Sequence, residues 1–384
     1  MKDIIYLDNA ATTFPKPRQV LDAVERFYTE QGGNPGRSGH RLSIAAGEVV
    51  EDARDRVARL INAEDPLQIA FTYNASYALN FAIWGTLEPG DRVLSSPLEH
   101  NSVARPLREA ERRLGITVEF IEADPVTGTI DLDDLARRLE RPARLVTIVH
   151  GSNISGTIQP LSEIGKLTRA AGALLLVDAA QTAGTYPIDV RSMNIDLLAF
   201  TGHKGLFGMM GTGGLYVRPG VDLRASFQGG TGSKSEQDVQ PDFLPDHLEP
   251  GTPNAGGLAA LAAGVQFLEE RSSIEEIHAY EQDLALELIE GILSIDGARV
   301  LGPTDGERLA VVSFTLPSLS VSEIGWRLDE EFGIMARVGL HCCPWGHEFF
   351  GTFPEGTVRL SLSIMNTRKD VLAAIDAVRA IARG

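Results

Sequence analysis

A lysine near the middle of the chain follows a predicted strand, in a position where its amine can do covalent chemistry. The segment Asp196–Lys204 reads DLLAFTGHK, so an apolar run leads through a glycine turn to the lysine. A lysine amine can form a Schiff base with an aldehyde. A lysine after a strand is more often a solvated charge, so this segment alone does not decide between the two.

The preceding predicted strand delivers an aspartate to a similar turn. Residues 173–181 read ALLLVDAAQ, which carries Asp178 out of an apolar run. An ionised carboxylate in apolar surroundings is costly unless a cation partners it. The protonated pyridine nitrogen of pyridoxal phosphate is such a cation, and the aldehyde of the same cofactor reacts with lysine. Asp178 and Lys204 therefore make one hypothesis, a site for pyridoxal phosphate.

Turns after other predicted strands offer groups for the same site. The turn 74–76 begins a predicted helix, whose N-terminal N–H groups suit a phosphate, although Ser76 is equally consistent with an ordinary helix cap. Thr201 and His203 flank the lysine and can reach that phosphate. His100 can stack on a pyridine ring and move protons, or it can be a surface or capping histidine.

Three more polar side chains have both a functional and a purely structural interpretation. Asn153 and Gln181 lie in turns, where an amide can bond to a ring hydroxyl or satisfy its own backbone. Arg359 lies in the segment TVRLSLS, residues 357–363, and alternates with apolar residues. Its guanidinium can bind a substrate carboxylate in a two-point fork, or it can face solvent.

The chain has 2 cysteines, Cys342 and Cys343, and because they are adjacent they cannot staple distant parts of the fold. They lie in the loop RVGLHCCPWGH, where arginine and histidine neighbours favour a reactive thiolate. An inert, buried thiol is the more common state of a cysteine. Adjacent cysteines fit poorly around one tetrahedral zinc even with His341 and His347 nearby, so we expect no metal site.

Alternating helices and apolar strands from about residue 42 onward must position these groups. Such strands read as a mainly parallel sheet covered on both faces, with ligands bound beyond the carboxyl ends of the strands. Residues 228–257 are rich in Gly, Ser, Asp and Pro, which indicates a long loop with a function or a contact to a second subunit. A helix-rich stretch and further strands, one of them predicted at 334–340, then form an α+β companion domain.

The length and the composition of the chain limit its number of domains and its classes of partner. A length of 384 residues suits two domains. The 52 acidic residues against 35 Lys and Arg disfavour nucleic acids and anionic membranes. No apolar run approaches the roughly 20 residues of a membrane span, and the first residues lack the apolar core of a signal peptide. We therefore expect a cytoplasmic protein.

Together these motifs resemble the cysteine desulfurases, within the class V aminotransferase family of fold type I pyridoxal phosphate enzymes. The resemblance covers nearly the whole chain and rests on many motifs in order. These are YLDNAATT (6–13), NPGRSGH (34–40), EHNS (99–102), DAAQ (178–181), TGHK (201–204), GTPN (251–254), RVGLHC (337–342) and RLS (359–361). The short cysteine loop is similar to that of the group that also acts as selenocysteine lyases.

The resemblance implies an α/β fold in two parts. The large pyridoxal phosphate-binding domain, residues 17–257, is expected to contain a mainly parallel seven-stranded sheet flanked by helices. A smaller α+β domain, residues 1–16 and 258–384, is expected to carry the cysteine loop.

The resemblance also implies roles for the individual residues. Lys204 becomes the Schiff-base lysine, Asp178 the partner of the pyridinium, Gln181 the partner of the ring hydroxyl, and His100 a catalytic residue that stacks on the ring. The residues implied to hold the phosphate are Ala75, Ser76, Thr201, His203 and, from the second subunit of a homodimer, Thr252 or, less favoured, Thr231. The residues implied to contact the substrate are His40, Asn153, which also touches the cofactor, and Arg359.

We therefore expect an enzyme that converts L-cysteine to L-alanine and leaves the sulfur on Cys342 as a persulfide, for a further protein to accept. Three alternatives stay open: a selenocysteine lyase acting on L-selenocysteine, a class V aminotransferase, and a non-catalytic sulfur-relay or scaffold protein. Two departures from the family pattern bear on the site. Cys343 directly follows the expected acceptor, which leaves open which thiol receives sulfur, and Tyr77 stands where relatives commonly carry glutamate.

Overall fold

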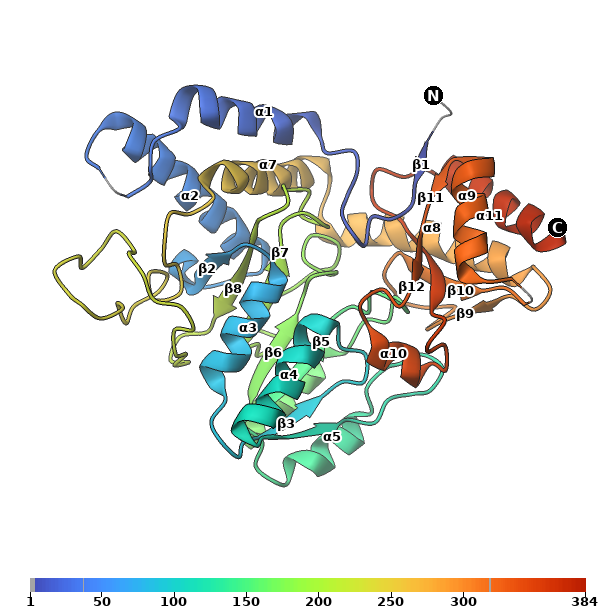
Figure 1. Ribbon diagram of the computed structural model, residues 1–384, viewed down its shortest axis with the longest axis horizontal. Coiled ribbons are helices and arrows are strands. Elements are labelled where there is room, and N and C mark those ends of the chain that lie inside the picture. Colours follow the sequence, from blue (N-terminus) through green and yellow to red (C-terminus); the bar gives the residue numbers. More distant parts are fainter. Residues whose placement is uncertain (1–3, 37, 318) are drawn as a thin grey trace.

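The computed structural model describes residues 4–36, 38–317 and 319–384. Figure 1 shows a larger α/β body and, beside it, a smaller group of strands and helices drawn mostly in orange and red. The N-terminal strand β1 (Ile5–Tyr6) lies with the smaller group, and the chain then crosses to the larger body before α1 (Arg18–Arg26). The first residues of the chain therefore connect the two parts.

The larger body is built on a 7-stranded sheet with the order β2-β8-β7-β6-β5-β3-β4. Its strands are β2 (Ile69–Thr72), β3 (Arg92–Ser95), β4 (Thr117–Phe120), β5 (Leu145–Val149), β6 (Leu174–Asp178), β7 (Leu197–Thr201) and β8 (Gly213–Val217). Strand β8 runs antiparallel to β7 and β2, whereas the pairings from β7 across to β4 are parallel. The predicted mainly parallel seven-stranded sheet is thus confirmed.

Helices cover both faces of this sheet. Successive side chains of a strand point to opposite faces, and apolar side chains on both faces are buried beneath helices. In β6, Leu175 and Val177 join one apolar cluster and Leu176 joins another. The first cluster includes residues of α2 (Arg41–Leu60), α5 (Leu132–Leu139), α6 (Leu161–Ala171) and α7 (Ala255–Arg271), and the second includes residues of α3 (Ala75–Thr86) and α4 (Asn101–Leu114). Burial on both faces explains why these strands read as continuous apolar runs.

The smaller part contains a 4-stranded antiparallel sheet with the order β12-β13-β10-β9. Its strands are β9 (Arg299–Val300), β10 (Val311–Thr315), β12 (Arg337–Gly339) and β13 (Thr357–Ser361). The helices α8 (Ile274–Leu293), α9 (Val321–Phe332) and α11 (Arg368–Arg383) share an apolar cluster with β10 and β13. The short helix α10 (Pro344–Phe349) directly follows the two cysteines.

The single strand predicted at 334–340 is wrong, because two short strands in different sheets replace it. Strand β11 (Ile334–Met335) pairs in parallel with β1, whereas β12 pairs antiparallel with β13. The partner of the first half comes from the opposite end of the chain, which the local apolar pattern could not indicate.

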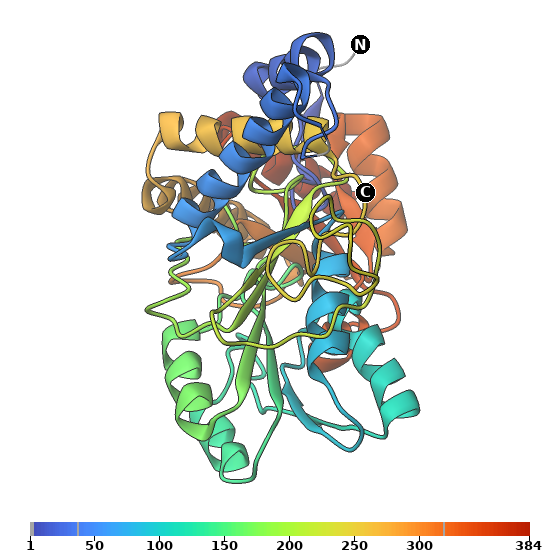
Figure 2. The ribbon, with the colours of Figure 1, turned by 90° about the vertical axis from the view of Figure 1, so that its left-hand side faces the viewer.

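The long loop predicted at 228–257 lies between β8 and α7, and no helix or strand is assigned between those two elements. Figure 2 looks at the molecule from the side where this loop, drawn in yellow, passes in front of the large sheet. Helix α7 follows it and places Leu258 and Leu261 in the large core. The division into a domain of residues 17–257 and a domain of 1–16 with 258–384 stays a prediction.

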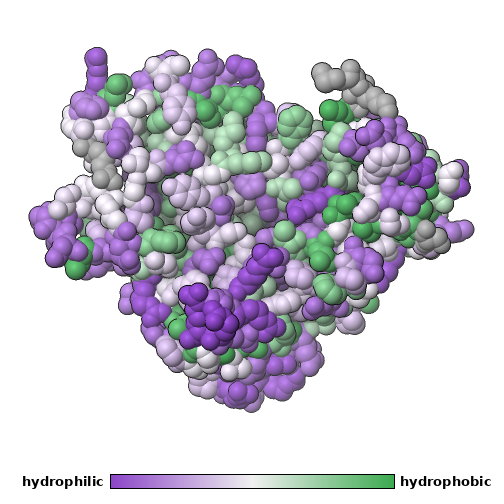
Figure 3. All heavy atoms as spheres, in the orientation of Figure 1, coloured by the Kyte–Doolittle hydropathy of each residue, from purple (hydrophilic) through white to green (hydrophobic). Residues whose placement is uncertain are grey.

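No helix among the described residues is both long and apolar enough to cross a bilayer. In Figure 3 hydrophilic residues gather over α4, whose exposed side carries the ion pairs Arg108–Glu111 and Arg112–Glu109. Exposed pairs of this kind contribute little to stability.

Glu281 of α8 is buried where the two parts of the chain meet, and its Oε1 accepts the Ile364 N–H at 2.7 Å. Burial raises the pKa of Glu281 to about 8 from an ordinary value of 4.5. When the pKa of an acid is higher in the folded protein than in the unfolded one, the free energy of unfolding falls as the pH rises between those two pKa values.

We therefore expect Glu281→Gln, which keeps the accepting oxygen and cannot ionise, to be more stable than the parent protein at pH 9. Near pH 5 the two proteins should differ little. Urea unfolding at the two pH values measures this. An equal difference in free energy of unfolding at both would contradict the assignment.

Candidate active site

Lys204 and Asp178 lie at the carboxyl ends of adjacent parallel strands. Asp178 is the last residue of β6 and pairs with Ala199 of β7, and the turn after β7 carries Lys204. Burial raises the pKa of Asp178 and lowers the pKa of Lys204 to about 8, and in both cases the charge of the other group acts in the opposite direction. Near neutral pH, more of Lys204 is therefore present as free amine than for an exposed lysine.

A cavity of about 240 Å³ lies at these strand ends. It brings together most of the residues predicted for the cofactor and one predicted for the substrate as well. These are Ala75, Ser76, His100, Asn153, Asp178, Gln181, Thr201, His203 and Lys204. The turns that carry them come from five different segments, and the alignment of the strand ends places them side by side.

Two helices begin at this cavity. Helix α3 starts at Ala75, and its capping residue Asn74 accepts the Tyr77 N–H at 3.2 Å. Helix α4 is capped by His100, whose Nδ1 accepts the Ser102 N–H at 3.1 Å. Helix N-termini carry partial positive charge and unpaired N–H groups, so the cavity suits an anion such as a phosphate.

His100 both caps a helix and faces the cavity. Burial, and after it the positive charge of Lys204, lower the pKa of His100 to about 3. Because Nδ1 accepts a hydrogen bond, the neutral ring carries its proton on Nε2. Ser102, whose hydroxyl lies 2.9 Å from that Nδ1 and 2.6 Å from the Ser76 hydroxyl, was not predicted, although its place in the first turn of a helix was a usable signal.

Two buried polar atoms of cavity-lining residues have no hydrogen-bond partner among the described residues: His203 Nδ1 and Asn153 Oδ1. An unpartnered buried polar atom costs about 1–3 kcal/mol, so such atoms fit a site that receives a polar ligand. The cavity therefore has groups that suit each part of pyridoxal phosphate. The helix N-termini and the hydrogen-bond donors suit its phosphate, the Asp178 carboxylate suits its ring nitrogen, and the Lys204 amine suits its aldehyde.

Arg359 is buried, at 1% exposure, so the alternative of a solvent-facing arginine is wrong. It lies on β13, where its Nη1 donates to the Asn153 carbonyl at 3.1 Å and its Nη2 donates to Asp8 Oδ1 at 2.7 Å. Its Nε has no partner within the described chain. The Asn153 side chain in turn donates to the His341 carbonyl at 2.7 Å, which joins the arginine to the cysteine loop.

The two cysteines have opposite environments. Cys342 is exposed, and Arg337 Nη2 lies 3.5 Å from its sulfur. Cys343 is buried in an apolar cluster with Leu98 and Ile154, and its thiol lies 3.3 Å from the Leu98 carbonyl. Burial raises the pKa of Cys343 to about 12, so this thiol stays protonated and inaccessible.

The backbone of the loop aims Cys342 outward. His341 and Cys342 both have left-handed φ angles, 48° and 58°, which non-glycine residues adopt at a cost of roughly 1–3 kcal/mol each. The Asn101 N–H holds the Cys342 carbonyl at 2.8 Å. Cys342 lines an open groove of about 490 Å³, and this groove shares Ser76, His100 and Ser102 with the cavity that holds Lys204. The exposed thiol therefore lies at the mouth of that cavity.

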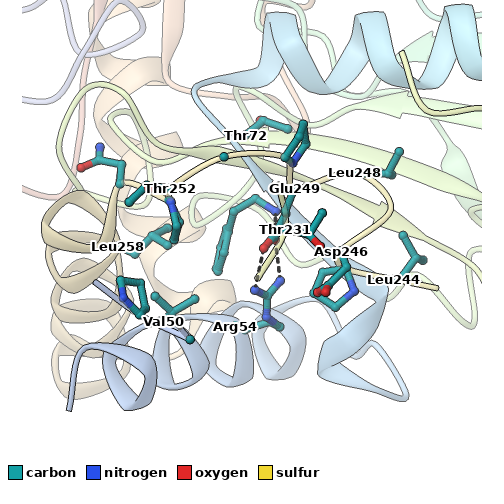
Figure 4. Close-up of a pocket in the computed structure, with 18 of the residues that line it drawn as sticks. Val50, Arg54, Thr72, Thr231, Leu244, Asp246, Leu248, Glu249, Thr252 and Leu258 are labelled. Atoms are coloured by element: carbon teal, nitrogen blue, oxygen red, sulfur yellow. Dashed lines mark hydrogen bonds and ion pairs between the residues drawn. The ribbon is translucent and has the colours of Figure 1, made fainter. Parts of the chain in front are cut away.

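Three predicted residues lie elsewhere within the single chain. Thr252 and Thr231 line a separate cavity of about 660 Å³ between the long loop and α2, where Arg54 pairs with Glu249 (Figure 4). His40 is exposed and caps α2, and it does not line the cavity around Lys204. Arg37, from the same motif, lies outside the described residues. In the described part of the chain, no group of three or more His, Cys, Asp or Glu side chains is placed to hold a metal ion.

A family model for class-V aminotransferases matches residues 5–373, which is nearly the whole chain. The chain belongs to the class-V aminotransferase family. The match includes both cysteines, the lysine turn and Arg359, so the cavity described above lies within the shared part.

Within this family the chain is similar to proteins named cysteine desulfurases. A probable cysteine desulfurase of Synechocystis is 34% identical over 99% of this chain and 91% of its own length, and a cysteine desulfurase of Haloferax volcanii is 32% identical over 98% and 89%. The apo structure of a cysteine desulfurase from Thermococcus onnurineus superposes with a TM-score of 0.92, at 34% identity over 99% of this chain and 95% of that one. The cysteine desulfurase CsdA of Escherichia coli, in an S-sulfonic acid form, gives a TM-score of 0.87 at 28% identity over the same shares.

The departure from the family pattern at Tyr77 lies outside the cavity around Lys204. Tyr77 is exposed, lines the larger cavity, and has its ring 5.6 Å from that of Tyr73 and 6.5 Å from that of Phe227. Its side chain therefore faces the long loop instead of the lysine turn.

The opposite environments of the thiols predict selective alkylation. Iodoacetamide at pH 8 should modify Cys342 in the folded protein and should reach Cys343 only after unfolding, because a buried thiol with a pKa of about 12 offers almost no thiolate. Mass spectrometry of the digested protein measures both sites. Modification of the two cysteines at similar rates in folded protein would show that Cys343 is not buried as described.

Proposed function

We propose that this protein is a pyridoxal phosphate-dependent cysteine desulfurase. It converts L-cysteine to L-alanine and transfers the sulfur to Cys342 as a persulfide. The observation that carries the proposal is the exposed Cys342 thiol at the mouth of the cavity that holds Lys204 and Asp178. The names of the class-V relatives and of the solved structures that this chain resembles support the same reaction.

The residues of the cavity fit pyridoxal phosphate. Ala75, Ser76, Thr201 and His203 would hold its phosphate at the N-terminus of α3. Asp178 would face the ring nitrogen, and the remaining cavity groups, His100, Gln181 and Asn153, would contact the ring and its hydroxyl. When bound, the cofactor supplies an aldehyde for the Schiff base with Lys204 and a ring that withdraws electrons from the substrate.

The substrate carboxylate would bind to Arg359 and Asn153. Arg359 keeps an unpartnered Nε–H, and Asn153 is already joined to it through its carbonyl. A carboxylate held there would fix the amino acid so that its α-hydrogen faces the amine of Lys204. Lys204, with a pKa of about 8, can accept that proton and return one near neutral pH.

Sulfur would then pass to the protein. Cys342, as the thiolate, attacks the sulfur of the bound cysteine, so that an S–S bond forms while the C–S bond of the substrate breaks. The electron pair of the broken bond stays with the carbon, which takes up a proton to give alanine. Arg337 Nη2 lies 3.5 Å from the sulfur of Cys342.

A second subunit would complete the site. Thr252 is exposed on the long loop and lies away from the cavity around Lys204 in its own chain. We propose that the protein is a homodimer in which Thr252 reaches the phosphate of the neighbouring subunit. The exposed position of Cys342 on an open groove also suits transfer of the sulfur to an acceptor protein.

Substitution of the two thiols tests the reaction. Cys342→Ala should lower the release of alanine from L-cysteine by at least about 10-fold, because the sulfur loses its nucleophile. Cys343→Ala is the matched control and should stay within about threefold of the parent protein, since it removes only a buried thiol. Alanine and sulfide are the products to measure. Undiminished turnover by Cys342→Ala would contradict the persulfide step, and formation of a keto acid would indicate a transaminase.

A further inference from the structure

The N-terminal segment supplies a charged group that no assigned role accounts for. Asp8 lies in the segment that crosses from β1 to α1, drawn in dark blue in Figure 1, and pairs with Arg359. We propose that Asp8 is a positioning residue, which holds the guanidinium of Arg359 so that its free edge faces the substrate carboxylate. This proposal rests on the proposed function, in which Arg359 binds that carboxylate.

Two of the three guanidinium nitrogens have a fixed partner. Arg359 Nη2 bonds to Asp8 Oδ1 at 2.7 Å, and Nη1 bonds to the Asn153 carbonyl at 3.1 Å. Because a guanidinium is planar and rigid, two such bonds in different directions determine the orientation of the third nitrogen. The third nitrogen, Nε, is buried and has no partner among the described residues. Its N–H and a remaining Nη hydrogen can form the two-point fork that carboxylates prefer.

Asp8 is itself held in place by the strand that carries Arg359. It forms a parallel bridge with Ser361, and the next two residues continue the contact. Asn9 Nδ2 donates to the Ser361 carbonyl at 3.0 Å, and the Ala10 N–H donates to the Ser361 hydroxyl at 2.9 Å. The carboxylate therefore presents a preorganised partner to the arginine instead of a mobile one.

The same segment also contacts the turns that would hold the cofactor. The Gln181 amide donates to the Ala10 carbonyl at 3.0 Å. The Thr12 hydroxyl and the Lys16 amine donate to the His203 carbonyl at 3.0 and 2.8 Å. One stretch of backbone thus joins the arginine of the smaller part to the Lys204 turn of the larger part. Asp8 is the member of this stretch that transmits the alignment to the substrate site.

Charge gives Asp8 a second effect on the arginine. Burial of Arg359 opposes its positive charge, and the neighbouring Asp8 favours that charge. Removal of the carboxylate would leave a buried guanidinium with one fewer partner and with more freedom to rotate. The loss should appear in the binding of the carboxylate and not in the sulfur step, which takes place at Cys342.

The test uses the cofactor-loaded enzyme with Asp8→Ala and Asp8→Asn. Asp8→Ala should raise the KM for L-cysteine by about 10-fold while kcat changes less than about threefold. Asp8→Asn keeps an oxygen that can accept the Nη2–H, so it should raise KM by only about threefold. The dissociation constant of L-alanine, which has the carboxylate but no sulfur, should rise in parallel. A merely structural role would lower kcat or thermal stability without this graded separation.

Arg359→Ala separates failure of this proposal from failure of the proposed function. If Arg359→Ala raises KM strongly and Asp8→Ala leaves it within about twofold, Arg359 binds the carboxylate without help from Asp8, and the positioning role is overturned. A lower KM in Asp8→Ala would show that Asp8 competes with the substrate, which also overturns it. If Arg359→Ala itself leaves KM unchanged, the substrate assignment in the proposed function is wrong. Should Asp8→Ala not fold, an Asp8→Asn enzyme with the KM of the parent protein contradicts the proposal on its own.

Discussion

The opposed charges of Asp178, buried at the end of β6, and Lys204, half-buried in the turn after β7, are the interaction on which the candidate site depends. Each group would be costly in an apolar strand end without a partner of opposite charge. Burial brings the pKa of Lys204 down to about 8, and Asp178 limits that fall. A lysine in this state is a usable amine near neutral pH, and the aspartate is a ready partner for a cation that enters the cavity.

The parallel sheet makes this interaction possible, because it brings the ends of distant segments to one edge. The remaining site groups are added from outside the sheet. Arg359 comes from the smaller part, and the N-terminal segment links it to the Lys204 turn. The cysteine loop is held beside the groove by the bond between the Cys342 carbonyl and the Asn101 N–H. The site therefore combines groups from two separately packed cores, and their relative positions depend on how the two cores are held together. The hydrogen bonds of Asp8 and Asn153 to Arg359 align these groups.

The parts of the site that follow strand ends could be predicted from the sequence. Asp178, His203 and Lys204 each follow an apolar run, and parallel strands place such positions together whatever the details of packing. Resemblance added Arg359 and Cys342, whose local sequences also fit a solvent-facing arginine and an inert thiol.

Other features depend on partners far away in the chain and could not be predicted. The carboxylate that orients Arg359 is 351 residues distant, and the strand predicted at 334–340 is divided by a pairing with the N-terminal β1. The adjacent cysteines look alike in sequence, and only the apolar cluster around Leu98 shows which of them is buried. Thr252 lies apart from the cavity around Lys204 in its own chain, and a contact with a second copy of the chain stays a proposal.

Trapping of the cofactor on the protein tests the central claim most directly. The apoprotein is mixed with pyridoxal phosphate, treated with borohydride to reduce any bond between an amine and the aldehyde, and mapped by peptide mass. The account predicts one modified lysine, Lys204, with no trapping there in Lys204→Ala and normal trapping in Lys166→Ala, which removes an exposed lysine of α6. Trapping spread over exposed lysines, or unchanged by loss of Lys204, would contradict it.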